Sequence, residues 1–244
     1  MGPRSRPMAE REERLLLYCI GDASPPLPDN GRGVQGRGLR CITHGELAAV
    51  VSSVAEPAWV ATPTREELLE YERVIHSRHA VADVVPMRFG SVLSDEEAVR
   101  AHLDEQRAAY LRALTRVSGC VEMGARALIS LPPPVTPEES AKPALRSGVD
   151  YLKARQRRYS AETRLRDHCA ALEQALLSKV APLCREHRSE LTSPCSAEPA
   201  LCSLYFLVPR DQMSAFRAAL SSIPDIGHTE LMLSGPWPPF NFVD

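Results

Sequence analysis

Proline placement limits what this chain can fold into more than any other feature of its sequence. The 21 prolines among 244 residues include a cluster from Pro132 to Pro143. Proline fixes one backbone torsion and cannot donate a backbone hydrogen bond, so a helix or central strand cannot run through this cluster. The sequence therefore predicts two folded regions, 15–131 and 148–244, joined by a linker at 132–147 and preceded by a disordered polar leader at 1–14.

The first region opens with strand patterns. Leu15–Ile20 is a continuous apolar run, as expected for a buried strand. Gly38–Thr43 and Glu46–Ser53 are two further strand-like segments, and only His44 and Gly45 separate them. Two-residue connections of this kind join antiparallel strands into a hairpin. The first region is therefore predicted to begin with one strand and a locally paired hairpin.

A helix is predicted after the hairpin. Thr64 and Glu67 have the spacing of a capping box, and apolar residues then recur at helical spacing. Pro86 is expected to end this helix, because proline cannot continue it. Met87–Gly90 is then predicted to be a short strand.

The rest of the first region gives the order from which its fold class follows. Ser94 and Glu97 open a second capped helix, and a strand is predicted at 120–131. The order is then strand, hairpin, helix, strand, helix, strand. This order predicts an α+β domain close to the ferredoxin-like fold, with one sheet and both helices on one of its faces.

The second region is predicted to be a smaller α+β unit. From Val149 to about Arg188 the chain has no glycine, and apolar residues recur every three or four positions, as in a long amphipathic helix. The remaining predicted elements are a strand at 201–208, a short helix from Asp211 to Leu220, a strand at 226–233 and an extended aromatic tail at 234–244.

Composition restricts the classes of partner. The 29 basic and 31 acidic residues are mixed along the chain, so no bulk charge favours nucleic acid or an anionic membrane. The longest apolar runs are far shorter than the roughly 20 residues of a membrane span. The seven cysteines are too sparse for a secreted disulfide framework. We therefore expect a reduced, cytoplasmic protein without a nucleic-acid or membrane partner.

The segment Gly31-Arg-Gly-Val-Gln-Gly36 matches the glycine spacing of a dinucleotide-binding loop, with Glu56 about 20 residues further on. In such sites the glycines open a helix whose N-terminus binds the pyrophosphate. Here Gly36 leads into a predicted strand instead. The favoured interpretation is a flexible surface loop, and a nucleotide-binding or enzymatic domain remains the alternative.

Two sets of residues have partial metal-ligand spacing. The first lies on one face of the first predicted helix and comprises Glu72, His76, His79 and Asp83. The second comprises Cys184, His187, Cys195 and Cys202. Neither set has a complete catalytic or zinc-knuckle pattern, so the favoured interpretation is a solvated helix edge for the first set and no metal for the second. No metal or other cofactor is expected.

Neither catalysis nor nucleic-acid binding has a recognisable motif. The sequence contains no nucleophile elbow, phosphate-binding loop or kinase signature, so we expect no enzyme activity. The first half of the long helix carries six basic residues, which suit an acidic partner if they share a face. Their spacing distributes them around the helix, which favours a solvated surface. They are Lys153, Arg155, Arg157, Arg158, Arg164 and Arg166.

Two further segments are physically unusual. In Val84–Val92, Pro86 is followed by Arg88 within an apolar stretch, and the C-terminal Ser234–Asp244 combines prolines with aromatic residues. These segments, together with His44–Val51 and Gly148–Leu152, resemble the sequences of the GvpF/GvpL family of gas-vesicle proteins. The resemblance covers almost the whole chain after the leader.

This resemblance implies two α+β domains and a role in gas-vesicle assembly. Members of the family contact GvpA, the small hydrophobic shell protein, and limit its aggregation as minor components or accessory proteins. The resemblance therefore implies a cytoplasmic, gas-vesicle-associated binding protein with GvpA, and other accessory proteins, as partners. A purely structural component of the vesicle wall is a third interpretation.

The structural or partner-contact candidates come from the two unusual segments. They are Arg88, Phe89, Trp237, Phe240 and Phe242. We expect the guanidinium of Arg88, on a strand after Pro86, to be paired with a carboxylate or with backbone carbonyls, because an unpaired buried charge is very costly. We expect the aromatic residues of the tail to be packed and to bridge the two regions, with a mobile tail that binds GvpA as the competing hypothesis.

Overall fold

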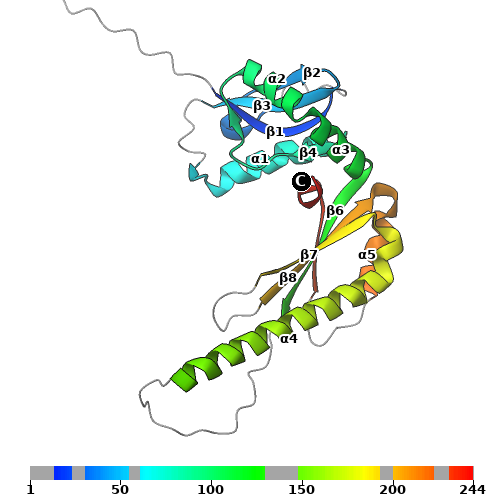
Figure 1. Cartoon of the computed structure of the whole chain (residues 1–244). Helices are drawn as coiled ribbons and strands as arrows, with labels where there is room; N and C mark the ends of the chain where they lie inside the picture. Colours follow the sequence, from blue (N-terminus) through cyan, green and yellow to red (C-terminus); the bar gives the residue numbers. More distant parts are fainter. Residues whose placement is uncertain are drawn as a thin grey trace, which may run out of the picture. The chain divides into compact units, whose positions relative to one another are not determined.

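The computed structural model describes residues 14–23, 31–54, 61–129, 148–192, 200–222 and 231–243, with the backbone alone described for 148–162. The linker predicted at 132–147 and all but the last residue of the leader lie outside these ranges. The described residues form a mixed α/β protein with two antiparallel sheets and five α-helices (Figure 1). Within them, no helix is both long enough and apolar enough to cross a membrane.

The chain divides into two compact units. Unit 1 comprises residues up to Val121 together with Trp237–Asp244, and unit 2 comprises Glu122–Pro236. This division differs from the predicted boundary at 132–147 and assigns most of the predicted tail to unit 1. The physical reason is strand pairing, which operates between segments far apart in the sequence and leaves no mark in local composition.

The sheet of unit 1 confirms the predicted first strand and hairpin. β1 (Arg14–Asp22) pairs antiparallel with β3 (Leu47–Val54), which pairs antiparallel with β2 (Leu39–His44). Gly45 connects β2 to β3 with a φ of 58°, a left-handed conformation that glycine adopts without strain. β4 (Val84–Pro86) completes the order β2-β3-β1-β4.

Helices cover both faces of this sheet (Figure 1). Leu15 and Leu17 of β1 pack with α2 (Glu96–Glu105) and α3 (Arg107–Val117), whereas Leu16 and Tyr18 pack with α1 (Arg65–His79). The expectation that both helices lie on one face is therefore wrong. The unbroken apolar run of β1 already has the pattern of a strand buried on both faces.

The first helix of unit 1 begins at its predicted N-terminal cap. Thr64 and Glu67 form the predicted capping box of α1. The helix nevertheless ends at His79 instead of continuing to Pro86, and Val84–Pro86 forms β4. Residues before proline prefer extended backbone, and Val84 and Val85 are β-branched, which explains the early end.

The second helix also differs in detail from its prediction. Asp95, not Ser94, is the N-cap of α2, and its carboxylate accepts a hydrogen bond from the backbone N–H of Ala98 at 2.8 Å. At Gln106 the helix breaks and α3 begins. The predicted single helix is therefore a pair of shorter helices.

Unit 2 is a four-stranded sheet with the order β7-β8-β6-β9. Its elements are β6 (Cys120–Ile129), α4 (Gly148–Val180), β7 (Glu186–Thr192), β8 (Ala200–Pro209), α5 (Met213–Ser221) and β9 (Leu231–Trp237). The strand predicted at 120–131 thus belongs to this sheet and not to the first. Because β6 lies outside the first sheet, that sheet lacks the last strand of the predicted ferredoxin-like order.

The long helix of unit 2 is shorter than predicted. α4 ends at Val180, Pro182 lies in a single 3-10 turn, and Glu186–Thr192 is strand β7. β7 pairs antiparallel with β8 along its whole length, from Glu186 opposite Leu207 to Thr192 opposite Leu201. The absence of glycine therefore indicated a helix over a segment that long-range pairing makes a strand.

Candidate partner-binding surface

The segment Met87–Ser91 interrupts an edge of the first sheet. β4 pairs with β1 up to Pro86 opposite Cys19, and β5 (Val92–Leu93) pairs with β1 again from Val92 opposite Leu16. The five residues between them leave the ladder. We call Met87–Ser91 the edge loop. The short strand predicted at Met87–Gly90 is therefore wrong, because strand pairing flanks this segment on both sides without including it.

Backbone hydrogen bonds fix both ends of the edge loop to β1. The N–H of Met87 donates to the carbonyl of Tyr18 at 2.9 Å, and the N–H of Leu17 donates to the carbonyl of Ser91 at 2.8 Å. Gly90 has a φ of 94°, a left-handed conformation that glycine tolerates. The edge loop therefore departs from the edge strand while hydrogen bonds to β1 hold both its ends.

Tyr71 of α1 contacts the edge loop through its hydroxyl and its ring. Its buried hydroxyl lies 2.8 Å from the carbonyl oxygen of Leu17, 3.0 Å from that of Met87 and 3.2 Å from that of Arg88. The ring of Phe89 packs edge-on against the Tyr71 ring, with centroids 5.1 Å apart. Burial raises the pKa of Tyr71, so its hydroxyl keeps the proton that it donates to these carbonyls.

Arg88 has a different environment from the one predicted. Its side chain is exposed, and within the described residues its guanidinium forms no ion pair. Its carbonyl is held instead: the N–H and the hydroxyl of Ser91 donate to it at 3.2 and 2.9 Å. The prediction of a paired, framework guanidinium is therefore corrected, because Arg88 lies on a loop and not inside a strand.

Removing the Tyr71 hydroxyl should loosen this support. Tyr71→Phe keeps the ring but removes the hydroxyl donor that the carbonyls of Leu17 and Met87 share, so we expect unit 1 to lose about 1–3 kcal/mol of stability. Urea unfolding followed by circular dichroism measures this loss. A change below about 0.5 kcal/mol, typical of a neutral surface substitution, would show that water replaces the hydroxyl without cost.

The C-terminal tail contains both buried and exposed aromatic residues. Phe242 is fully buried with Pro238 and Pro239, whereas Trp237 is 39% and Phe240 36% exposed. The Trp237 ring lies edge-on to His76 of α1, with centroids 5.1 Å apart. Burial lowers the pKa of His76, which favours its neutral form beside the indole. Bridging of the two regions by the tail stays a prediction.

The glycine-rich loop uses its own backbone donors. The N–H of Gly33 donates to the Arg37 carbonyl, that of Val34 to the Tyr18 hydroxyl, and that of Gln35 to the Glu70 carboxylate. A side chain at Gly33 would overlap the Tyr18 hydroxyl. These amides are therefore unavailable to a phosphate, and nucleotide binding has no support.

The residues with partial metal-ligand spacing are not brought together. No group of three or more His, Cys, Asp or Glu side chains converges within the described part of the chain. Asp83 accepts hydrogen bonds from Ser118 and Gly119, and His76 contacts Trp237. Cys195 lies outside the described residues.

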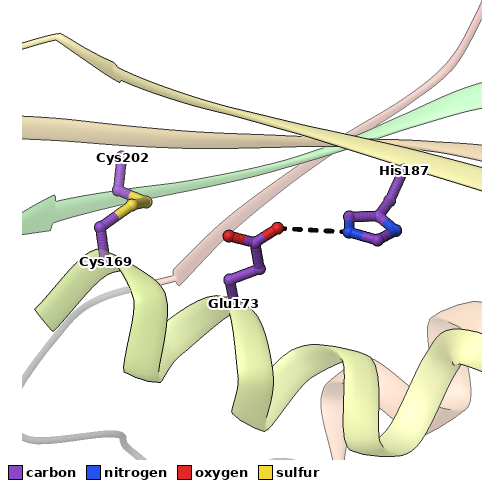
Figure 2. The surroundings of a disulfide bond; sticks show 4 residues. All are labelled: Cys169, Glu173, His187 and Cys202. Carbon is purple, nitrogen blue, oxygen red and sulfur yellow. Dashed lines mark ion pairs between the residues drawn. A yellow bond between two sulfur atoms is a disulfide. The ribbon is translucent and has the colours of Figure 1, made fainter. Parts of the chain in front are cut away.

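Cys202 has a structural partner that the sequence did not indicate. It forms a disulfide with Cys169, which joins α4 to β8 with a Cα–Cα distance of 6.1 Å (Figure 2). Nearby, His187 lies 3.2 Å from the carboxylate of Glu173 (Figure 2). The expectation of fully reduced cysteines therefore differs from the structure. Cysteine spacing does not encode pairing, because the bond depends on α4 lying across β8.

The basic stretch of α4 is only partly described. Arg164 and Arg166 are exposed, and the other four basic side chains lie outside the described side chains. The helical spacing after Glu67 predicts Tyr71 only as one more apolar position and indicates no site there. A tyrosine on the buried face of an amphipathic helix signals a hydroxyl that needs a partner, and this signal could have identified it.

The two-sheet α/β fold is that of solved gas-vesicle GvpF structures. GvpF from Anabaena sp. PCC7120 superposes with a TM-score of 0.72 and 17% sequence identity, covering 95% of this chain and 96% of that chain. GvpF from Microcystis aeruginosa has a TM-score of 0.68 and 15% identity, covering 95% and 99%. These superpositions show that the chain shares the fold of the two GvpF structures.

The chain belongs to the GvpL/GvpF family of gas-vesicle synthesis proteins, whose family model matches residues 14–244. Gas vesicle protein F of Streptomyces sp. (strain CB03234) is 30% identical over 237 residues, covering 93% of this chain and 98% of that protein. Gas vesicle protein F2 of Halobacterium salinarum is 28% identical over 240 residues, covering 96% and 93%. These matches confirm the family resemblance identified from the sequence.

Proposed function

We propose that this protein is a non-enzymatic accessory factor or minor component of gas vesicles that binds the shell protein GvpA and limits its aggregation during nucleation and assembly. The match of the GvpL/GvpF family model to residues 14–244 is the observation that carries this proposal. We place the protein in the cytoplasm, at the growing vesicle.

Physical chemistry supports a binding role of this kind. A shell protein that assembles through apolar surface must be shielded before it joins the wall, or it aggregates. Unit 1 has a buried apolar core, and several further large apolar side chains are exposed on its surface. The exposed set is Leu68, Leu69, Val81, Trp237 and Phe240. Side chains of this kind supply contact area for a hydrophobic partner.

We also infer that the two units act as two domains. Unit 1 keeps the predicted order of strand, hairpin, helix, strand and helix up to Val117. We propose that it is a rearranged ferredoxin-like domain whose last strand, β6, has joined the other sheet.

Co-purification tests the proposed function. The tagged full chain is expressed with GvpA alone and, separately, with the complete set of vesicle proteins, and washed vesicles are isolated in the second case. We expect the full chain to capture GvpA and to reduce the amount of GvpA that pellets as aggregate. Retention on washed vesicles identifies a permanent component, and recovery only from the soluble fraction identifies a transient factor. Failure to capture GvpA in either setting would overturn the proposal.

A further inference from the structure

We infer that Arg88, displayed by the edge loop, is a contact residue that binds a carboxylate side chain of the protein partner. This inference rests on the proposed function, because it assigns part of the partner-binding surface. Neither the family match nor the fold comparison assigns a role to this residue.

The edge loop holds its backbone in place before any partner arrives. Both its ends are hydrogen-bonded to β1, and the Tyr71 hydroxyl contacts the carbonyls of Met87 and Arg88. The ring of Phe89 is packed on Tyr71. A fixed backbone lowers the conformational entropy that binding must remove, so a residue on such a loop is a better contact than one on a mobile loop.

The departure from the ladder changes where residue 88 is aimed. An edge strand that continued straight from Pro86 to Val92 would alternate its side chains between the two helix-covered faces of the sheet. The excursion directs Phe89 toward Tyr71 and leaves Arg88 exposed. Irregularities of edge strands commonly re-aim a side chain in this way.

The chemistry of the exposed group indicates the partner group. Within the described residues the Arg88 guanidinium has no ion-pair partner, and its planar fork of N–H donors matches a carboxylate bidentately. Leu68, 38% exposed, lies one turn before Tyr71 on α1 and so borders the residue on which Phe89 packs. Arginine and aromatic residues are enriched at interface hot spots, and the edge loop carries one of each in Arg88 and Phe89.

Edge protection is the competing explanation. A charged side chain and an irregular backbone at a sheet edge both discourage pairing with a second copy of the chain. In that case Arg88 prevents self-association and contributes nothing to partner binding. The two explanations predict different losses when the residue is changed.

The experiment measures capture of GvpA by the full chain carrying Arg88→Lys, Arg88→Ala or Arg88→Glu. Arg112→Ala, an exposed arginine on α3, is the matched control. We expect binding to weaken about tenfold for Arg88→Ala and further for Arg88→Glu, with Arg88→Lys intermediate because lysine keeps the charge but loses the fork. Melting temperatures and the oligomeric state should not change, and Arg112→Ala should bind as the wild type does.

Each other outcome overturns the assignment. Unchanged binding together with self-association of Arg88→Ala establishes edge protection instead. A lowered melting temperature of Arg88→Ala shows that Arg88 stabilises the fold of unit 1 and does not act as a contact residue. Equal loss in Arg112→Ala shows a general charge effect. If the wild-type chain itself captures no GvpA, the proposed function fails and this assignment fails with it, whereas wild-type capture with full binding by all Arg88 variants removes this assignment alone.

Discussion

Replacing Phe242 by alanine should destabilise unit 1 by about 3–5 kcal/mol, the usual cost of removing a fully buried phenylalanine. Phe242 has no exposed surface, although it is two residues from the end of the sequence. The neighbouring Val243 packs against the core cluster that contains Leu15 and Leu17 of β1. Phe242 and Val243 are therefore packed in the core of unit 1, and small shifts of the surrounding residues cannot fill a cavity at Phe242.

Urea unfolding of the full chain measures this effect, and Phe240→Ala is the matched control. Phe240 lies in the same 3-10 turn but is 36% exposed, so its replacement should cost clearly less than that of Phe242. GvpA capture by the two variants adds a second readout. Equal, small losses for both variants would mean that the tail does not pack in solution, and loss of capture without loss of stability would support the competing hypothesis of a tail that binds the partner.

Reduction of the Cys169–Cys202 disulfide should destabilise unit 2 by about 3–4 kcal/mol. The two cysteines are separated by 33 positions, and closing a loop of that length removes this much conformational freedom from the unfolded chain. Both cysteines are buried, and the bond fixes α4 on β8 beside Leu172 and Leu176. Under reducing conditions we therefore expect α4 to be held by its apolar face and by the contact between Glu173 and His187.

Thermal melting with and without a phosphine reductant tests this prediction. The double variant Cys169→Ala/Cys202→Ala should be less stable than the oxidised wild type and should not respond to the reductant. Cys184→Ser is the control, because Cys184 forms no disulfide and should leave the response unchanged. Burial raises the pKa of the Cys19 thiol to about 12, so this cysteine should not interfere by exchange. Identical melting of the wild type in both conditions would show that the two cysteines are thiols in solution.

Local sequence rules predicted the elements that depend on neighbours in the chain. The strand at β1, the β2–β3 hairpin with Gly45 and the capping box at Thr64 all depend on interactions within a few residues. Caps and two-residue turns have sequence patterns because the same few side chains or torsions satisfy them in any protein. The family, too, could be identified from short segments such as Pro86–Gly90.

Elements fixed by distant partners were predicted poorly. The glycine-free stretch predicts a helix that includes part of Glu186–Thr192, because nothing local marks this segment as a strand, and only its pairing with β8 makes it one. The order of elements likewise predicts β6 in the first sheet, whereas its pairing partners lie in the second. Strand propensity measures how well a side chain fits a pleated sheet, so it does not identify which sheet a strand joins.

The candidate surface also combines features that the sequence predicts with features that only the tertiary structure determines. The sequence by itself determined which residues are unusual: Arg88 in an apolar stretch, and the aromatic residues among the prolines of the tail. Only the tertiary structure decided that Arg88 is displayed and Phe242 is buried. The physical reason is that burial depends on which other elements pack around a side chain. Tyr71 on α1 lies 17 positions from Arg88, and Leu15 and Leu17 on β1 lie near the opposite end of the sequence from Val243, so no local sequence pattern reports these contacts.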